Sequence, residues 1–229
     1  MHPGIHAANN PDKAAYIMAN SGRVISYGEL NDASNQGAQL FRSLGLGLGD
    51  NIAIYMENNA AFLQICWAAH RAGLYYTCIS SYLTAEEVDF IVGDCQAKVF
   101  ITSQAKAEVA AELVDMMPNA KTRLMVGEAI AGYQSYDDAI AAQPHGPIAD
   151  EYEGADMLYS SGTTGRPKGI KKPITGEPLG TTNSPVDIAG TLYGVTEAAI
   201  YLSPAPLYHS APLRFNMGIL RKGGTTIVM

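Results

Sequence analysis

The fold is decided by residues 51–102, which read NIAIYMENNAAFLQICWAAHRAGLYYTCISSYLTAEEVDFIVGDCQAKVFIT. Short apolar runs rich in β-branched and aromatic residues alternate here with segments of helical length, a pattern typical of parallel βαβ units. The predicted strands are 51–56, 74–79 and 98–102, and the predicted helices between them are 60–71 and 85–94. Asn58 or Asn59 is expected to cap the first helix, and Thr84 with Glu87 to form a capping box for the second. The stretch predicts an α/β fold in which helices flank a parallel sheet.

The same alternation extends in both directions from this stretch. On the amino-terminal side, Ser26 is expected to cap a helix over 27–44, which the glycines of 45–49 end in a turn. On the carboxyl-terminal side we expect helices at 103–116 and 133–142 and strands at 123–126, 156–159 and 225–229, the last with no helix after it to cover it. The loop 143–154 is a possible subdomain seam, and 173–185 is too rich in Pro, Gly and Thr to be regular.

The composition narrows the classes of function. The 229 residues carry 15 Lys plus Arg against 22 Asp plus Glu, a formal charge of -7, which argues against a general nucleic-acid binder. At 47% hydrophobic and 16% charged, the chain has enough apolar side chain for a core. No window approaches the roughly 18 apolar residues of a membrane span. Cys66, Cys78 and Cys95 form no CxxC pair, which favours a reducing, cytoplasmic location.

The segment that carries chemistry is 159–169, which reads YSSGTTGRPKG. Its glycines allow turns that direct successive backbone N–H groups toward one point, and its four Ser and Thr hydroxyls add further donors. Lys168 supplies a compact positive charge. Four of the fifteen basic residues lie within 166–172, where there is no acidic residue. The segment therefore predicts a site for phosphate groups, but it is not a Walker loop, because Gly169 follows the lysine where that pattern needs Ser or Thr.

At every position from 159 to 169 the segment resembles the signature of the adenylate-forming (AMP-binding) superfamily, which includes acyl-CoA synthetases, luciferases and peptide-synthetase adenylation domains. The resemblance continues in the family's order through 24–30, through Gly49-Asp50 with Asn58, and through 69–87, which is similar to an Ala-Gly-x-x-Tyr-x-Pro stretch and the helix after it. Cys78 departs from that stretch, since the family usually has proline there. Residues 204–212 resemble a Pro-Leu-Phe-His element that borders the carboxylate-substrate pocket.

The resemblance implies the N-terminal part of an acyl-CoA-synthetase-like large domain. Residues 1–229 are expected to form this partial domain and to stop before the adenine-stacking signature, the ribose-binding aspartate and the C-terminal lid. The implied reaction has two steps: a carboxylate, expected to be a fatty acid, attacks the α-phosphate of ATP to give an acyl-adenylate and pyrophosphate, and coenzyme A then takes the acyl group. ATP, Mg²⁺ and coenzyme A are the implied cofactors. The chain by itself is expected to be inactive or weakly active.

The resemblance also assigns roles to particular residues. The residues expected to contact the nucleotide phosphates are Ser160, Ser161, Gly162, Thr163, Thr164, Gly165 and Lys168. Thr164 is the residue closest to magnesium by analogy, and Lys168, Thr164 and His209 are the expected catalytic residues. Tyr208 and His209 would border the acyl group. Two alternatives stay open: a catalytically incompetent nucleotide-binding or interaction module, and an aryl-acid or amino-acid adenylating enzyme. Exposed apolar surface also makes self-association an expectation.

Two other patterns are interpreted as structural. Residues 193–197 spell Tyr-Gly-Val-Thr-Glu, like the family's adenine and magnesium signature, but they precede Tyr208, whereas the family's signature follows that element. We interpret the match as coincidence and do not expect Glu197 to bind metal. Cys66 and His70 are four residues apart on one predicted helix, and without further ligands this pair more often reflects core packing than a metal site.

Overall fold

The computed structural model describes residues 1–160, 167–181 and 190–229. Within these ranges the larger sheet has six strands, all parallel, in the order β7-β6-β5-β3-β4-β8. The strands are β3 (Asn51–Tyr55), β4 (Tyr75–Ile79), β5 (Val99–Ser103), β6 (Thr122–Val126), β7 (Gln134–Ser135) and β8 (Ala155–Asp156). The predicted α/β fold with a parallel sheet is confirmed.

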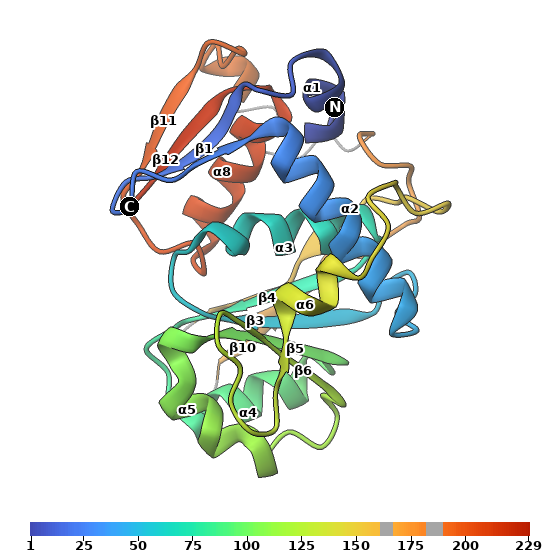
Figure 1. Cartoon of the computed structure of the whole chain (residues 1–229), viewed down its shortest axis with the longest axis vertical. Coiled ribbons are helices and arrows are strands. Elements are labelled where there is room, and N and C mark those ends of the chain that lie inside the picture. The colour runs from blue at the N-terminus through green and yellow to red at the C-terminus, as the bar shows by residue number, and fades with distance from the viewer. Residues whose placement is uncertain (161–166, 182–189) are drawn as a thin grey trace.

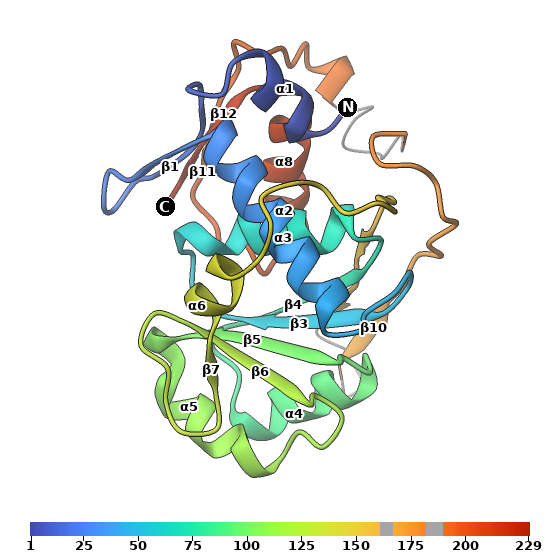
Figure 2. The same cartoon turned by 45° about the vertical axis from the view of Figure 1, so that its right-hand side comes forward.

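Helices cover both faces of this sheet, as Figures 1 and 2 show. One face packs against α2 (Tyr27–Ser43), α3 (Ala60–Arg71) and α6 (Tyr136–Ala141), and the other against α4 (Ala85–Asp94) and α5 (Ala107–Glu112). Along β4, Tyr76 and Cys78 enter the first core, whereas Tyr75 and Ile79 enter the second. Because neither face meets water there, the central strands β3, β4 and β5 are buried at every position and do not alternate between apolar and polar residues.

A smaller sheet has the order β11-β12-β1-β2. Its strands are β1 (Ala14–Met18), β2 (Val24–Ser26), β11 (Ile200–Ser203) and β12 (Thr225–Val228), and it is accompanied by α1 (Pro3–Asn9) and α8 (Ser210–Arg221). Figure 2 shows α2 and α3 between the two sheets. The strand expected at 225–229 is not a bare end of the fold, because β12 lies between β1 and β11, parallel to both. Its two neighbours come from opposite ends of the chain, which no local pattern reveals.

The predicted helix caps are present. Ser26 and Glu29 form a capping box at the start of α2, Thr84 and Glu87 form one at α4, and the Asn59 side chain accepts the N–H of Ala61 at α3. These local signals explain why α3 and α4 begin at the predicted residues.

Three predicted elements are interrupted. The helix expected at 103–116 is split into η1 (Gln104–Lys106), α5 and η2 (Leu113–Asp115); the Ser103 hydroxyl donates to Glu57 Oε2 (2.5 Å) and caps no helix. The helix expected at 133–142 begins only at α6, because β7 comes first and the Ser135 hydroxyl accepts the N–H of Asp138. The strand expected at 156–159 divides at Met157 into β8 and β9 (Leu158–Ser160).

The outer face of the smaller sheet carries an aliphatic row. Leu202 of β11, Ile227 of β12, Ile17 of β1 and Val24 of β2 are in register with one another across all four strands. Leu202 is 55% exposed and Val24 51% exposed. This row is the exposed apolar surface with which self-association would be compatible, and self-association stays a prediction. In the described ranges, no helix is both long and apolar enough to cross a bilayer.

The contact between α2 and α3 depends on a glycine. A Cβ at Gly37 would lie 2.6 Å from Cβ of Ala68, so the two helices approach closely only because position 37 has no side chain. Gly93, near the end of α4, has no atom within 4 Å of such a Cβ. The two helical glycines are therefore a matched pair.

We expect Gly37→Ala to lower the free energy of unfolding by about 1–3 kcal/mol, because an added methyl overpacks the α2–α3 contact. Gly93→Ala should raise it by up to about 1 kcal/mol, since alanine is the better helix former and meets open space. Urea unfolding of both variants measures the two values. Equal effects of the two substitutions would contradict the close packing at Gly37.

Candidate functional site

The phosphate motif lies on a hairpin of two short antiparallel strands, β9 and β10 (Lys168–Ile170). Ser160 at the end of β9 is directly opposite Lys168 at the start of β10, and both are exposed. The structure thus brings together two of the predicted phosphate ligands, which are eight residues apart. The remaining five, Ser161, Gly162, Thr163, Thr164 and Gly165, lie outside the described residues.

The glycine that ends the motif is required by packing. A Cβ at Gly169 would lie 2.6 Å from Cε of Met157 and 2.9 Å from Cζ of Tyr159, its partner in the hairpin register. The Tyr159 hydroxyl in turn donates to Oδ2 of Asp94 (2.5 Å), the last residue of α4. Burial and the bond to Asp94 raise the pKa of Tyr159 well above its usual value, so the phenol keeps its proton. The strand that leads into the motif is therefore attached to α4.

A buried ionic cluster holds the chain beyond the hairpin. Glu153 accepts hydrogen bonds from Arg221 Nη2 (2.6 Å) and from the backbone N–H of Gly180 (2.5 Å), and it contacts Nε2 of His70. Its backbone N–H donates to the carbonyl of Glu177 (2.8 Å). Burial acts to raise the pKa of Glu153, but the bonds and charges of His70 and Arg221 outweigh it and hold that pKa well below its usual range. The carboxylate is therefore ionised and paired.

A second ion pair connects the hairpin to the smaller sheet. Asp156, in β8 just before the hairpin, accepts hydrogen bonds from Nε and Nη2 of Arg214 in α8, at 3.2 Å on Oδ1 and 2.6 Å on Oδ2. Planar two-point pairing of this kind fixes orientation as well as distance. It ties the base of the phosphate motif to the helix that follows the predicted acyl-binding residues.

Tyr208 and His209 lie at the amino end of that helix. Tyr208 is buried, His209 is exposed at the N-cap position of α8, and their ring centroids are 4.6 Å apart. The turn before them is anchored by Asn58, whose Oδ1 accepts the N–H of Leu207 (2.8 Å) and whose Nδ2 donates to the carbonyl of Met229 (2.6 Å). In the described part of the chain, no hydrogen bond, ion pair or ring contact joins either aromatic residue to Lys168.

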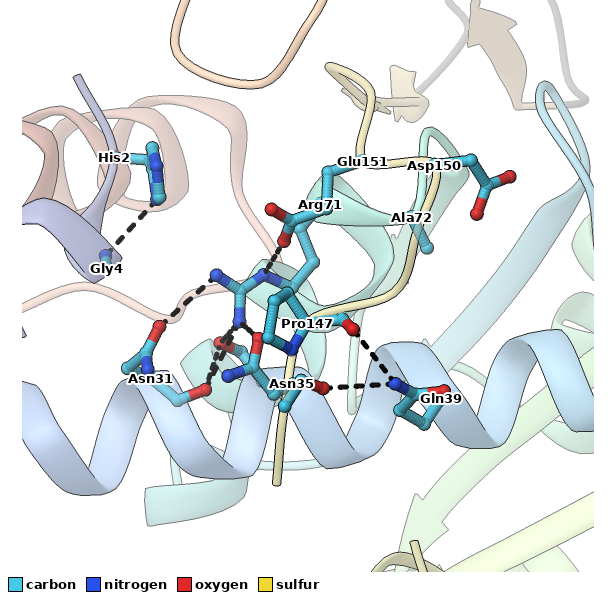
Figure 3. Close-up of polar contacts among 12 residues, drawn as sticks. His2, Gly4, Asn31, Asn35, Gln39, Arg71, Ala72, Pro147, Asp150 and Glu151 are labelled. Atoms are coloured by element: carbon cyan, nitrogen blue, oxygen red, sulfur yellow. Dashed lines mark hydrogen bonds and ion pairs between the residues drawn. The ribbon is translucent and has the colours of Figure 1, made fainter. Parts of the chain in front are cut away.

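The loop 143–154 packs on two helices through Arg71, the last residue of α3. Figure 3 shows Arg71 reaching Asn31 and Asn35 of α2 on one side and Glu151 of the loop on the other, with Nε 2.9 Å from the Glu151 carboxylate. Burial lowers the pKa of Arg71 and raises that of Glu151, although each charge favours ionisation of the other. Gln39 of α2 donates to the carbonyl of Pro147 (3.1 Å). Whether 143–154 marks a subdomain boundary stays a prediction.

The patterns interpreted as structural have ordinary surroundings. The Glu197 side chain is 74% exposed, and its backbone carbonyl accepts a hydrogen bond from Lys13. His70 is engaged by Glu153 and Arg221, and Cys66 is buried in the core. Within the described ranges, no three His, Cys, Asp or Glu side chains group in a way that could hold a metal ion.

The sequence interpretation missed the charged residues that tie the candidate site together: Arg71, Glu153, Asp156, Arg214 and Arg221. A signal exists for two of the three arginines, because Arg71 and Arg221 are the last residues of mostly apolar helices, where a cation complements the helix dipole. No spacing rule identifies their carboxylate partners, which come from a loop and a short strand.

Two histidines, the half-buried His2 and the buried His70, predict how stability depends on pH. Burial, aided by the charge of Arg71, lowers the pKa of His2 to about 4, and burial also lowers the pKa of His70. Because both pKa values lie below the unfolded value of 6.5, the unfolded chain binds more protons as pH falls. Stability is therefore complete above about pH 6.5 and is lost toward pH 4.

We expect Tm to decrease when the pH is lowered from 7.5 to 5.0, and we expect the decrease to be smaller in His2→Asn. The Nδ1 atom of His2 accepts the N–H of Gly4 as the cap of α1, and asparagine can keep that bond without titrating. Thermal unfolding followed by circular dichroism at the two pH values gives both slopes. If the Tm of His2→Asn decreases as much as that of the wild type, titration of His2 does not contribute to the pH dependence of stability.

Comparisons with known proteins agree with the geometry. A family model described as AMP-binding enzyme matches residues 5–229. The chain is 29% identical over 191 residues to a 4-hydroxybenzoate–CoA/benzoate–CoA ligase of Rhodopseudomonas palustris, covering 81% of this chain and 34% of that protein. It is 28% identical over 232 residues to the long-chain-fatty-acid–CoA ligase FadD13 of Mycobacterium tuberculosis, covering 97% of this chain and 43% of that protein.

The fold has counterparts among solved structures. The N-terminal domain of FACL13 from Mycobacterium tuberculosis, solved with an inhibitor, superposes with a TM-score of 0.81 at 24% identity, covering 99% of this chain and 56% of that one. The expected fold, the N-terminal part of an acyl-CoA-synthetase-like domain, is thereby confirmed. The chain spans less than half the length of the two curated relatives.

Proposed function

The chain belongs to the AMP-binding enzyme family, whose model matches residues 5–229, and from this premise we propose that it serves the ATP-dependent activation of a carboxylic acid. The observation that carries the proposal is the hairpin base, where Lys168 stands opposite Ser160 at the two ends of the YSSGTTGRPKG motif. Exposed hydroxyl and ammonium groups at one point suit a phosphate group.

The proposed chemistry needs positioning and charge stabilisation from the protein. A carboxylate oxygen attacks the α-phosphorus of ATP, the bond to the bridging β-phosphate oxygen breaks, and pyrophosphate leaves with the developing negative charge. Lys168, Ser160 and the motif residues 161–165 would hold the β- and γ-phosphates. The thiol of coenzyme A then attacks the acyl carbonyl and AMP leaves. Tyr208 and His209 would border the acyl group.

Magnesium fits the donor chemistry of the motif, because hydroxyl and phosphate oxygens are the ligands that this hard cation prefers. Thr164 is the protein residue that we assign to it, and when bound it would neutralise phosphate charge. Its role stays a prediction, since Thr164 lies outside the described residues.

A fatty acid is the first proposed substrate, supported by the likeness to a long-chain-fatty-acid–CoA ligase over 97% of the chain. An aryl acid is the alternative, supported by the likeness to a benzoate–CoA ligase over 81%. An amino acid stays a third alternative.

A second candidate function is a nucleotide-binding or interaction module without turnover. The chain corresponds to 34% and 43% of the length of the two curated relatives. We expect these 229 residues alone to bind nucleotide phosphates but to turn over poorly or not at all. A cytoplasmic location stays a prediction as well; the three cysteines are buried and unpaired.

Carboxylate-dependent exchange of labelled pyrophosphate into ATP separates the two candidates. With the 229-residue chain and a panel of fatty and aryl acids, we expect exchange near the background rate. Exchange at the rate of a full-length ligase would show that these 229 residues suffice for adenylation. The acid that supports the fastest exchange would then identify the substrate class. A folded chain that neither exchanges nor binds pyrophosphate would contradict the proposed function.

Lys168→Ala should weaken pyrophosphate binding about 10- to 100-fold, because it removes a charge-assisted contact, and should leave Tm unchanged because the side chain is exposed. Calorimetric titration measures the Kd. Lys172→Ala is the matched control. Lys172 lies four residues after Lys168, its side chain is also exposed, and its replacement removes the same charge. If both variants weaken binding equally, general positive charge rather than Lys168 accounts for the affinity.

A further inference from the structure

Tyr75 lies where the larger sheet meets the phosphate hairpin. It is the first residue of β4, 4% exposed, and it packs in the core beside Met157. Its backbone N–H donates to the carbonyl of Asp50 (2.8 Å), and it is in register with Asn51 of β3 and Ala155 of β8. The side chain therefore projects from a backbone that is held on both sides by neighbouring strands.

The Tyr75 hydroxyl binds the chain just after β10. It donates to the carbonyl of Lys172 (2.6 Å) and accepts the N–H of Ile174 (3.0 Å). The Nζ atom of Lys171 lies 4.3 Å from the centroid of the same ring, within the range of a cation–π contact. One side chain thus contacts three of the four residues that follow Ile170.

These contacts matter because the outgoing arm of the hairpin, residues 171–176 after β10, makes few other hydrogen bonds. In the described part of the chain, residues 171–176 make no backbone–backbone hydrogen bond outside the strands. Strand β10 itself is exposed along its length. The incoming strand is attached to α4 through Tyr159 and Asp94. The chain that continues from Lys168 and β10 is held by the contacts of Tyr75 and by the packing of Ile174 against the core that contains Tyr75.

We propose that Tyr75 is a positioning residue for phosphate binding: by holding residues 171–174 with its hydroxyl and ring, it keeps Lys168 opposite Ser160. This inference rests on the proposed function and deepens it. Tyr75 occupies an unspecified position of the Ala-Gly-x-x-Tyr-x-Pro stretch, so the family resemblance assigns it no role. It would touch neither the nucleotide nor the acid and would act through the chain that carries Lys168.

The test compares Tyr75→Phe with Tyr55→Phe. Tyr55 is a buried tyrosine of the adjacent strand β3, and its hydroxyl donates to a backbone carbonyl away from the hairpin, that of Leu83 (3.0 Å). Each variant loses one hydroxyl and keeps its ring, so the two should lose similar global stability. Hydrogen exchange of the Ile174 amide reports on the arm without any ligand, and pyrophosphate titration reports on the site.

We expect Tyr75→Phe, and not Tyr55→Phe, to speed exchange at Ile174 and to raise the Kd for pyrophosphate about three- to tenfold, the effect of one net hydrogen bond. Lys168→Ala should then cost less in the Tyr75→Phe background than in the wild type, because Lys168 is already misplaced. Unchanged exchange at Ile174, an unchanged Kd, or an undiminished effect of Lys168→Ala would each overturn the positioning role.

If Tyr75→Phe fails to fold, Lys171→Met tests the same arm from the surface. It removes the contact with the Tyr75 ring, and Lys172→Met removes the same charge without that contact. Only Lys171→Met should speed exchange at Ile174 and raise the Kd, and equal effects would overturn the inference. A wild-type chain that binds no pyrophosphate overturns the proposed function itself, and the positioning role that rests on it, whatever the exchange at Ile174 shows.

Discussion

The buried carboxylate of Glu153 is the constraint on which the arrangement of the two sheets depends. It is 6% exposed, and it is satisfied only when His70 of α3, Arg221 of α8 and the N–H of Gly180 all reach it. A buried charge that loses a partner is strongly unfavourable. The cluster therefore requires α3, which packs on the larger sheet, and α8, which packs on the smaller one, to be in place together.

The geometry of the candidate site depends on this buried cluster of Glu153, His70 and Arg221. Glu153 lies three residues before Asp156, whose pairing with Arg214 links β8 to α8. Strand β8 leads into the phosphate hairpin, and α8 follows Tyr208 and His209. Asn51 and Tyr75, the first residues of β3 and β4, contact Met157 and the arm after β10, so the hairpin lies at the amino-terminal edge of the parallel strands. Chemistry that depends on positioning is thus supported by a rigid sheet.

Much of this architecture could be predicted because it rests on local signals. The starts of α3 and α4 follow from Asn59 and from the Thr84–Glu87 capping box, which satisfy backbone N–H groups within three residues. The central strands β3, β4 and β5 could be recognised because burial on both faces makes them mostly apolar along their whole length. Ser135 and Ser103 show the limit of such signals: one hydroxyl caps a helix later than periodicity suggests, and the other binds Glu57 and caps none.

By itself, the sequence determined the α/β class and the capped helices, and it located the motif at 159–169 for which phosphate binding is proposed, because each depends on residues close together in the chain. Only the tertiary structure decided that β12 lies between β1 and β11, that Glu153 joins His70 and Arg221, and that Tyr75 holds the arm after β10. The β11–β12 pairing joins residues 25 positions apart, and the other contacts join residues from about 70 to more than 200 positions apart. Their energy comes from desolvation and pairing between surfaces that meet only once the chain has folded.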